Sequence, residues 1–330
     1  MNVRLGVAVP LFAALLAACA SEPPPPPAPA PVPVPAEPAP PPPPPPMPIP
    51  GPVATVKAVQ PPVMRVRAGK KAALRPGDEI RAEDKIETGK GSRVQMALRD
   101  ASVVKLGQNA AFEVGALKAT QPAGGNKYLE AAFSVLKGAF RYTSAALADT
   151  GWKRNINLRI GTTVTAGVRG PDVWGRADDS QEMICLIEGR IEAGKVGEPP
   201  VLLDEPKTYY QIPAGQAPRP VGPATGAQLD DWVAQTELDP ARPALGDGPW
   251  AVVIETFRAS EDAALFSEDL AAQGYPLEVR EAVIKNKPMY RVVLQGYDSA
   301  DAARKAIPPL EAALAHKGLW VMMLKATPEN

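Results

Sequence analysis

The sequence is poor in cysteine, histidine and aromatic residues, and it carries no excess of either charge. With two cysteines and one histidine in 330 residues, it lacks the clustered ligands of a zinc site, so we expect neither a metal nor another cofactor. Lys plus Arg and Asp plus Glu both number 36, and Phe, Trp and Tyr make up 5%. The chain thus has neither the cationic field nor the stacking platform of a nucleic-acid-binding protein, and we predict no nucleic-acid partner.

Catalytic signatures are also missing. The sequence contains neither a nucleophile elbow nor a phosphate-binding loop. The single histidine, His316, falls near the end of a predicted helix, where the helix dipole favours it. Adjacent carboxylates occur, but neighbours along a strand point to opposite faces, and carboxylates in turns are usually solvated. We therefore predict that the protein is not an enzyme. These carboxylates are Asp78–Glu79, Asp178–Asp179 and Asp230–Asp231.

What is present begins with a signal-peptide pattern over residues 1–18. Arg4 supplies a positive start, and residues 5–16 form an apolar run that is too short to span a bilayer. Two alanines then precede Cys19, and the segment resembles the lipobox of bacterial lipoproteins. The resemblance implies a lipid anchor, with acyl chains such as palmitate, on Cys19. The absence of an aspartate after Cys19 implies an outer-membrane location. An ordinary secretory signal with an incidental cysteine is the alternative.

Residues 19–53 are mostly proline and alanine. Such a segment cannot bury a core, so we predict a disordered stalk that populates polyproline II. At about 3.1 Å per residue, some thirty residues would reach on the order of 90 Å. The segment is therefore predicted to be a spacer between the membrane and the rest of the chain. A ligand for a proline-reading domain is the alternative, but flanking charges are lacking.

Residues 54–217 have the pattern of an all-β domain. Apolar and polar residues alternate over 93–98, 102–106 and 111–114, and Gly- and Asp-containing turns separate such runs. Only residues 129–136 resemble an amphipathic helix. With Cys19 lipidated, Cys185 would have no disulfide partner, and its apolar neighbours predict a small buried side chain.

Several segments of this β-rich part resemble the FecR domain. They occur in the family's order over about 150 residues, and the resemblance implies a periplasmic β domain that interacts with other proteins. The matching segments are 74–80 (LRPGDEI), 84–94 (DKIETGKGSRV), 98–107 (LRDASVVKLG), 136–141 (LKGAFR), 163–173 (TVTAGVRGPDV) and 186–191 (LIEGRI). Pro171, in the fifth segment, stands where the family usually has Thr.

Residues 218–247 are rich in proline and glycine and are predicted to be a flexible linker. One short helix is expected inside it, over residues 225–236. Thr225 would cap this helix, and Leu229, Trp232 and Val233 would share one face.

Residues 248–326 are predicted to form a second domain. Strands are expected at 250–257, 277–283, 289–294 and 319–324. One helix is expected to be capped by Ser260 and to end at Gly274, and the other to be capped by Ser299. Pro308 and Pro309 should kink the second helix or make it restart. The resulting order, βαββαβ, predicts an α+β ferredoxin-like fold.

This segment resembles the SPOR domain, in its order and over its whole length. The matching stretches are 250–257 (WAVVIETF), 290–293 (YRVV) and 296–303 (GYDSADAA). The resemblance implies binding to peptidoglycan glycan strands that have lost their peptides, mostly at division sites.

Thr256, Tyr290 and Arg291 lie adjacent to the family's binding positions. Tyr290 could stack on a sugar face, and Thr256 or Arg291 could donate hydrogen bonds to it. Strand alternation places Tyr290 and Arg291 on opposite faces, so we expect one of them to be structural. The sequence departs from the family at Val253, Glu255, Met289 and Gln295, where Gln, Gly, an aromatic residue and Gly are common.

The sequence thus predicts a multidomain, non-catalytic outer-membrane lipoprotein that faces the periplasm. Its SPOR-like domain would bind glycan, and its FecR-like domain would contact an envelope protein, in envelope organisation or division. Two alternatives remain: FecR-type periplasmic signalling, and a SPOR-like module that binds protein without binding glycan.

Overall fold

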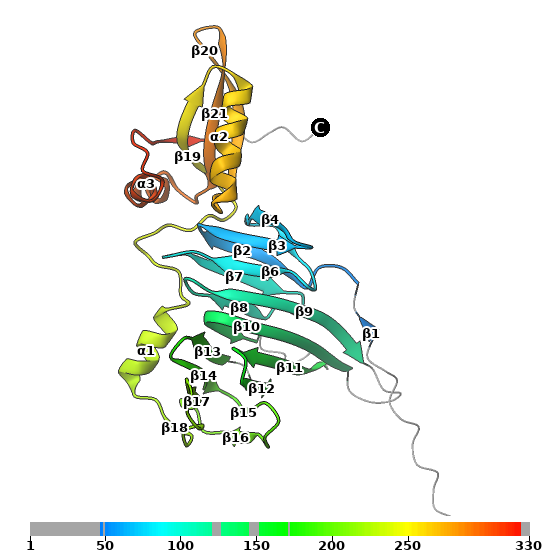
Figure 1. The fold of residues 1–330 in the computed structure, drawn as a ribbon. Coiled ribbons are helices and arrows are strands. Elements are labelled where there is room, and N and C mark those ends of the chain that lie inside the picture. The colour runs from blue at the N-terminus through cyan, green and yellow to red at the C-terminus, as the bar shows by residue number, and fades with distance from the viewer. Residues whose placement is uncertain (1–46, 49, 121–126, 145–151, 171, 325–330) are drawn as a thin grey trace, which may run out of the picture. The chain divides into compact units, whose positions relative to one another are not determined.

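The computed structural model describes residues 47–48, 50–120, 127–144, 152–170 and 172–324. The predicted signal peptide, Cys19, most of the proline-rich segment and Pro171 lie outside these residues. None of the helices formed by the described residues combines the length and apolar character needed to span a bilayer. Figure 1 shows the described chain as a β-rich part followed by a smaller part with two helices and a sheet.

Two sheets that share one long strand, β10, build the β-rich part, and together they close into a barrel. All pairings are antiparallel except that between β10 and β11. The first sheet contains, in order of pairing, β4 (Lys70–Ala73), β3 (Val63–Arg67), β6 (Lys85–Thr88), β9 (Ala111–Thr120), β10 (Lys127–Thr143), β11 (Trp152–Ile160), β12 (Val164–Val168), β15 (Ile191–Lys195) and β16 (Val201–Leu203), with β1 (Met47–Pro48) beside β9.

The second sheet continues through the C-terminal half of β10. Its strands, in order of pairing, are β5 (Glu79–Ile80), β2 (Ala54–Gln60), β7 (Arg93–Leu98), β8 (Val103–Leu106), β10, β13 (Asp172–Asp178), β14 (Gln181–Glu188), β17 (Thr208–Pro213) and β18 (Gly222–Pro223).

Strand β10 passes from one sheet to the other at Gly138. Its residues pair with β9 up to Lys137, and from Gly138 onward they pair with β13. Gly138 has φ +85°, and a Cβ atom there would lie 2.5 Å from the Cα of Ala110. Only glycine meets both conditions without strain. Residues 129–136, predicted as a possible helix, are therefore part of this strand.

Alternating apolar side chains of both sheets fill the space between them. The largest fully buried members of this core include Phe112, Phe140 and Tyr142. Cys185 is buried outside the main core, in a smaller cluster with Trp174 and Met183. Burial raises the pKa of its thiol to about 12, so Cys185 is an inert apolar side chain, as predicted.

The segment predicted as a flexible linker instead packs against the outer face of the second sheet. Strand β18 lies near its start, and helix α1 (Gly226–Ala234), which Thr225 caps as expected, follows. We call residues 225–245 the strap. The Trp232 ring stacks on Trp174 with centroids 5.4 Å apart, and its edge meets Tyr209. Apolar side chains on one face of a short helix thus anchor it to the sheet.

Ion pairs and backbone bonds extend this attachment along the strap. Glu237 accepts from Lys105 at 2.6 Å and from Arg141 at 2.8 Å. Further on, Val59 and Leu245 exchange backbone hydrogen bonds of 3.0 and 2.7 Å. The strap therefore crosses the second sheet from β17 and β13, which contact Trp232, to β2, which pairs with Leu245.

The C-terminal part contains β19 (Gly248–Phe257), α2 (Ser260–Ala272), β20 (Leu277–Ile284), β21 (Lys287–Gly296), α3 (Ala300–Leu314) and β22 (Trp320–Met323). Its strands pair antiparallel in the order β20-β21-β19-β22. Both helices cover one face of this sheet. Their buried side chains, among them Leu270 and Leu310, share a core with Val252 and Val292 of the sheet.

Two details of the helices differ from the sequence-based expectation. Helix α2 begins at Ser260 itself, and Ala259 is its N-cap without a side-chain hydrogen bond. Helix α3 is capped by Ser299 as predicted, but it continues through Pro308 and Pro309 without restarting. The prolines remove two backbone donors, and burial of Ala306 and Leu310 on either side holds the helix together.

Candidate functional site

The sheet of the C-terminal part has one face that the helices do not cover, which we call the open face. Residues paired across neighbouring strands lie on the same face of a sheet, so the register of the strands identifies the residues of the open face. Thr256 pairs with Arg291, which pairs on its other side with Arg280. Val253 pairs with both Val293 and Trp320. Three strands thus bring Thr256, Arg291 and Arg280 side by side, and the fourth adds Trp320.

An irregularity in β19 decides which of its side chains reach the open face. The register with β21 shifts between Val253 and Glu255, so two consecutive residues point away from the open face. Ile254 enters the core under the helices, and a carboxylate oxygen of Glu255 lies 3.1 Å from His316 Nε2. Because of this bulge, Thr256 returns to the open face.

Arg291 is the central cationic side chain of the open face. Its Cζ lies 5.0 Å from the centroid of the Trp320 ring, and its Nη1 lies 4.0 Å from the sulfur of Met322. Its Nε is buried and donates to no other described residue. No carboxylate of the described residues forms an ion pair with it. Arg291 thus presents a half-buried guanidinium whose donors are largely unused.

Arg280, its cross-strand neighbour, is held by partners on one side. It donates to Glu278 at 3.1 Å and to Gln295 at 2.7 Å, and Gln295 donates back to Glu278 at 2.8 Å. The Nε of Arg280, like that of Arg291, is buried and lacks a partner within the described part of the chain. Two guanidinium groups side by side are destabilising unless an acceptor lies between them.

The structure separates the three residues predicted as the glycan site. Thr256 and Arg291 lie opposite each other on the open face. Tyr290 lies on the other face with its partner Phe257, and both pack against the core under the helices. Strand alternation predicted that either Tyr290 or Arg291 would pack inside the fold, and Tyr290 is the one that does.

Trp320 supplies the exposed aromatic ring that the sequence analysis assigned to Tyr290. The sequence predicts the strand that contains Trp320 but not the position of its ring, because the pairing of β22 with β19 cannot be read from the sequence. Its side chain is 41% exposed and shares its face with Arg291. A wide apolar ring beside hydrogen-bond donors is the usual lining of a site for a small polar ligand such as a sugar.

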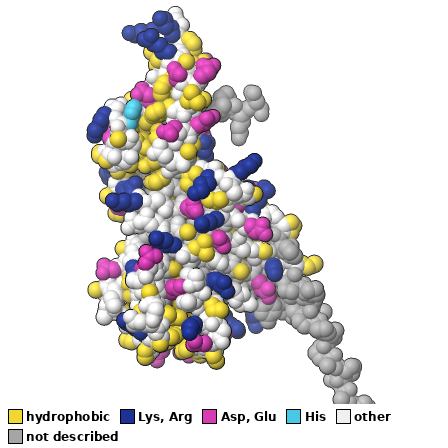
Figure 2. All heavy atoms as spheres, in the orientation of Figure 1, with side chains coloured by type: hydrophobic (Ala, Val, Ile, Leu, Met, Phe, Trp, Pro, Cys, Tyr) yellow, Lys and Arg dark blue, Asp and Glu magenta, His cyan; other side chains and the backbone are white. Residues whose placement is uncertain are grey.

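The ionisable side chains bear on whether the described part of the chain could hold a metal ion and whether it carries a patch of one charge. Within the described ranges, no three His, Cys, Asp or Glu side chains are grouped so that they could hold a metal ion. Figure 2 shows Lys and Arg side chains interspersed with Asp and Glu over the face that it draws.

Comparison with known proteins identifies both folded parts. A family model described as SPOR domain matches residues 246–322, and one described as FecR protein matches residues 84–192. No curated protein sequence matches the chain.

Two crystal structures of a provisionally named anti-sigma factor from Parabacteroides distasonis are similar in outline. They are 12% and 13% identical to this chain, with TM-scores of 0.34 and 0.33. They cover 74% and 73% of this chain and 99% of their own.

FecR and SPOR domains are binding and regulatory domains, and the SPOR type binds peptidoglycan. The chain contains a FecR domain at residues 84–192 and a SPOR domain at residues 246–322.

Proposed function

We propose that the protein is a non-catalytic envelope protein that binds peptidoglycan glycan strands through the open face of its SPOR domain. It would be anchored in the outer membrane by lipid on Cys19 and would face the periplasm. The FecR domain would contact a protein partner in envelope organisation or division.

The observation that carries this proposal is the group formed by Arg291, Trp320 and Thr256. Trp320 offers an exposed ring for the apolar face of a sugar. Arg291 offers a buried donor, its Nε, that no described residue uses. A desolvated donor without a partner costs free energy, so its retention favours a ligand that accepts its hydrogen bonds.

The chemistry of the strand explains why removal of the peptides would favour binding. A stem peptide is attached by an amide to the lactyl group of the muramic acid unit. Its removal leaves a free carboxylate at that position. A guanidinium binds a carboxylate in a planar fork and holds it more strongly than a neutral amide. Arg291 beside Arg280 would thus select peptide-free strands.

The rest of the chain supports a role at the envelope through its order. The apolar leader and Cys19 come first, followed by a proline-rich stalk that we take to be disordered, and then by the two domains. We also infer a ferredoxin-like topology for the SPOR domain, supported by the βαββαβ order and the strand order β20-β21-β19-β22. This topology leaves one face of the sheet free for a long ligand.

Retention on purified cell-wall sacculi tests the proposal. One batch is treated with an amidase that removes the stem peptides, and the other is left intact. We expect the protein to sediment with stripped sacculi and much less with intact ones. Equal retention, or none, would contradict the proposal and would favour a SPOR domain that binds protein instead.

A further inference from the structure

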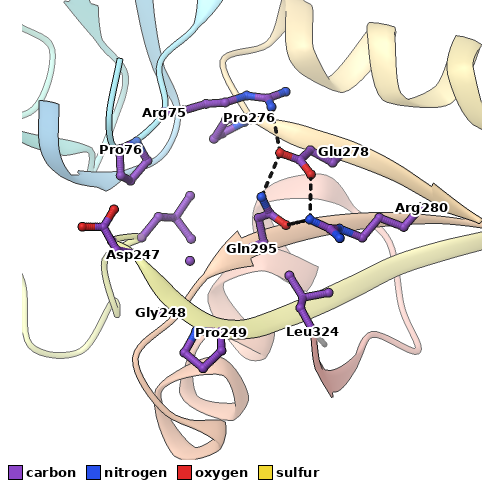
Figure 3. A pocket seen from close by; sticks show the side chains of 13 residues that line it. Arg75, Pro76, Asp247, Gly248, Pro249, Pro276, Glu278, Arg280, Gln295 and Leu324 are labelled. Atoms are coloured by element: carbon purple, nitrogen blue, oxygen red, sulfur yellow. Dashed lines mark hydrogen bonds and ion pairs between the residues drawn. The ribbon is translucent and has the colours of Figure 1, made fainter. Parts of the chain in front are cut away.

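A polar pocket lies where the open face meets a loop of the β-rich part. We call this part FecR-like, because the FecR family model matches residues 84–192 of it. Its volume is about 450 Å³, and Figure 3 shows its lining. Glu278, Arg280 and Gln295 come from the SPOR sheet, and Asp247 comes from the entry to β19. Arg75 comes from the loop between β4 and β5. The pocket therefore combines residues that are some two hundred positions apart in the chain.

Arg75 is held against the edge strand of the SPOR sheet. Its Nη1 lies 3.0 Å from Glu278 Oε1, and its Nη2 donates to the carbonyl oxygen of Leu277 at 2.7 Å. Glu278 also accepts from Arg280 and Gln295, so one carboxylate joins three donor side chains. Figure 3 shows these groups converging on one wall of the pocket.

The pocket's charges balance. Arg75 and Arg280 contribute two positive charges, and Glu278 and Asp247 contribute two negative ones. Such a lining offers donors and acceptors at fixed positions without net charge. It suits hydroxyl and acetamido groups of a sugar better than a phosphate or another strong anion.

The pocket is continuous with the open face along β21. Gln295 is four residues beyond Arg291 on the same strand, and both side chains lie on the open face. At about 3.4 Å per residue, the two positions are on the order of 14 Å apart. A single sugar unit cannot contact both Arg291 and Gln295, but a glycan strand of several units can.

We propose that this pocket is a second saccharide subsite, to which the FecR-like part contributes Arg75. The pocket holds sugar units of the glycan strand that lie beyond the units stacked on Trp320. This inference rests on the proposed function, since it concerns the same glycan. It gives the FecR-like part a direct role in glycan binding, and it predicts that affinity rises with strand length.

The test uses the full chain and peptide-free glycan oligosaccharides of increasing length, with titration calorimetry as the measurement. We expect the wild-type protein to bind long oligosaccharides more tightly than short ones. Arg75→Ala should weaken binding of long ones about tenfold and leave binding of the shortest unchanged. Arg81→Ala is the matched control, because the guanidinium of Arg81 pairs with Glu79 of the same part and Arg81 is not among the residues that line the pocket.

A second variant separates ligand contact from simple attachment of the two parts. Pro249 is exposed at the pocket, and its carbonyl accepts from Leu324 through the backbone. Pro249→Trp should fill the pocket while the Arg75–Glu278 pair stays in place. We expect it to abolish the gain in affinity with length, as Arg75→Ala does.

Three results would overturn the subsite. The first is equal affinity of the wild type for oligosaccharides of all lengths, and the second is an Arg75→Ala variant whose affinities match those of Arg81→Ala. The third is a Pro249→Trp variant whose affinity still rises with oligosaccharide length although that of Arg75→Ala does not. Absence of binding at every length would instead refute the proposed function itself, and the subsite with it.

Discussion

At the scale of single residues, the open face is defined by an arrangement that costs stability. Arg280 and Arg291 are direct cross-strand neighbours, and like charges in such positions repel. Glu278 balances Arg280, whereas the described partners of Arg291 are the Trp320 ring and the sulfur of Met322, and neither is a carboxylate. Folding alone gives no reason for this choice of residues, whereas binding of an acceptor between the two guanidinium groups does.

The two aromatic residues near the site should respond differently to truncation. Trp320→Ala removes an exposed ring, and we expect glycan binding to weaken about five- to thirtyfold, or about 1–2 kcal/mol, with little change in stability. Tyr290→Ala removes a ring from the core under the helices and should destabilise the fold by about 2–3 kcal/mol. Glycan affinity and thermal unfolding, measured on both variants, check this assignment. The reverse pattern would place the sugar on the helix-covered face.

Glu182 gives the β-rich part a predictable dependence on pH. Burial tends to raise the pKa of this carboxyl, but hydrogen bonds from the Thr163 hydroxyl and from the backbone of Thr162, Thr163 and Val164 outweigh it, so the pKa is lowered. A lowered pKa stabilises the fold above the unfolded-state pKa of about 4.3, and the stability is lost as the pH falls through the folded-state pKa.

Glu182→Gln should therefore be less stable than wild type by about 1–3 kcal/mol at pH 7. The difference should shrink as the pH drops below about 4. Urea unfolding of both proteins between pH 7 and pH 3 measures it. A difference that stays constant over this range would show that the charge of Glu182 is not responsible.

At the scale of elements, the strap attaches closely to a sheet from which its sequence predicts it to be free. Its proline and glycine content predicts a flexible linker, but Trp232 and Glu237 attach it to the second sheet. Composition describes what a segment does in isolation. The docking positions, Trp174 and Lys105, are distant in sequence and become neighbours only after the sheet has formed.

Removal of the strap's main anchor should be measurable. Trp232→Ala loses the stacking on Trp174 and the edge contact with Tyr209, and we expect a loss of about 2–4 kcal/mol in unfolding free energy. Asp231→Ala, an exposed neighbour on the same helix, is the control and should change stability by less than about 0.5 kcal/mol. If both variants unfold like wild type, the packing of the strap contributes nothing to stability.

Periodicity predicted the elements of the SPOR domain well, because its strands and helices are short and regularly patterned. It did not predict β10 along its full length. Residues 129–136 contain good helix formers, but β9 and β11 pair with them from both sides, and such pairing overrides intrinsic propensity.

The candidate site was predictable only in part, because some of its residues are placed by pairing between strands that are distant in the sequence. Alternation correctly separated Tyr290 from Arg291, since they are adjacent on one regular strand. The bulge near Glu255 and the place of Trp320 depend on register with β21 and β22. Register is set by packing of the whole sheet and is not encoded in any one segment.

At the scale of the whole molecule, the proposed attachment to the outer membrane depends on Cys19, which lies outside the described residues. Cys19→Ala should release the protein from the membrane fraction, because a lipid on this cysteine is the predicted attachment. Cys185→Ala is the matched control, since this buried cysteine is more than 160 positions along the chain from Cys19, and the variant should stay with the membranes. Fractionation of cells that express each variant gives the answer. Full membrane retention of Cys19→Ala would refute the lipoprotein assignment.

The central claim is that the open face of the SPOR domain binds glycan through Arg291. The most direct test is the dissociation constant of the full chain for peptide-free glycan strands, measured for wild type, Arg291→Ala and Arg304→Ala. Arg304 is the control, because it lies exposed on α3 and pairs with Asp301. We predict saturable binding by wild type and by Arg304→Ala, and a loss of about ten- to a hundredfold for Arg291→Ala. Equal affinity of all three proteins, or no binding by any of them, would contradict the claim.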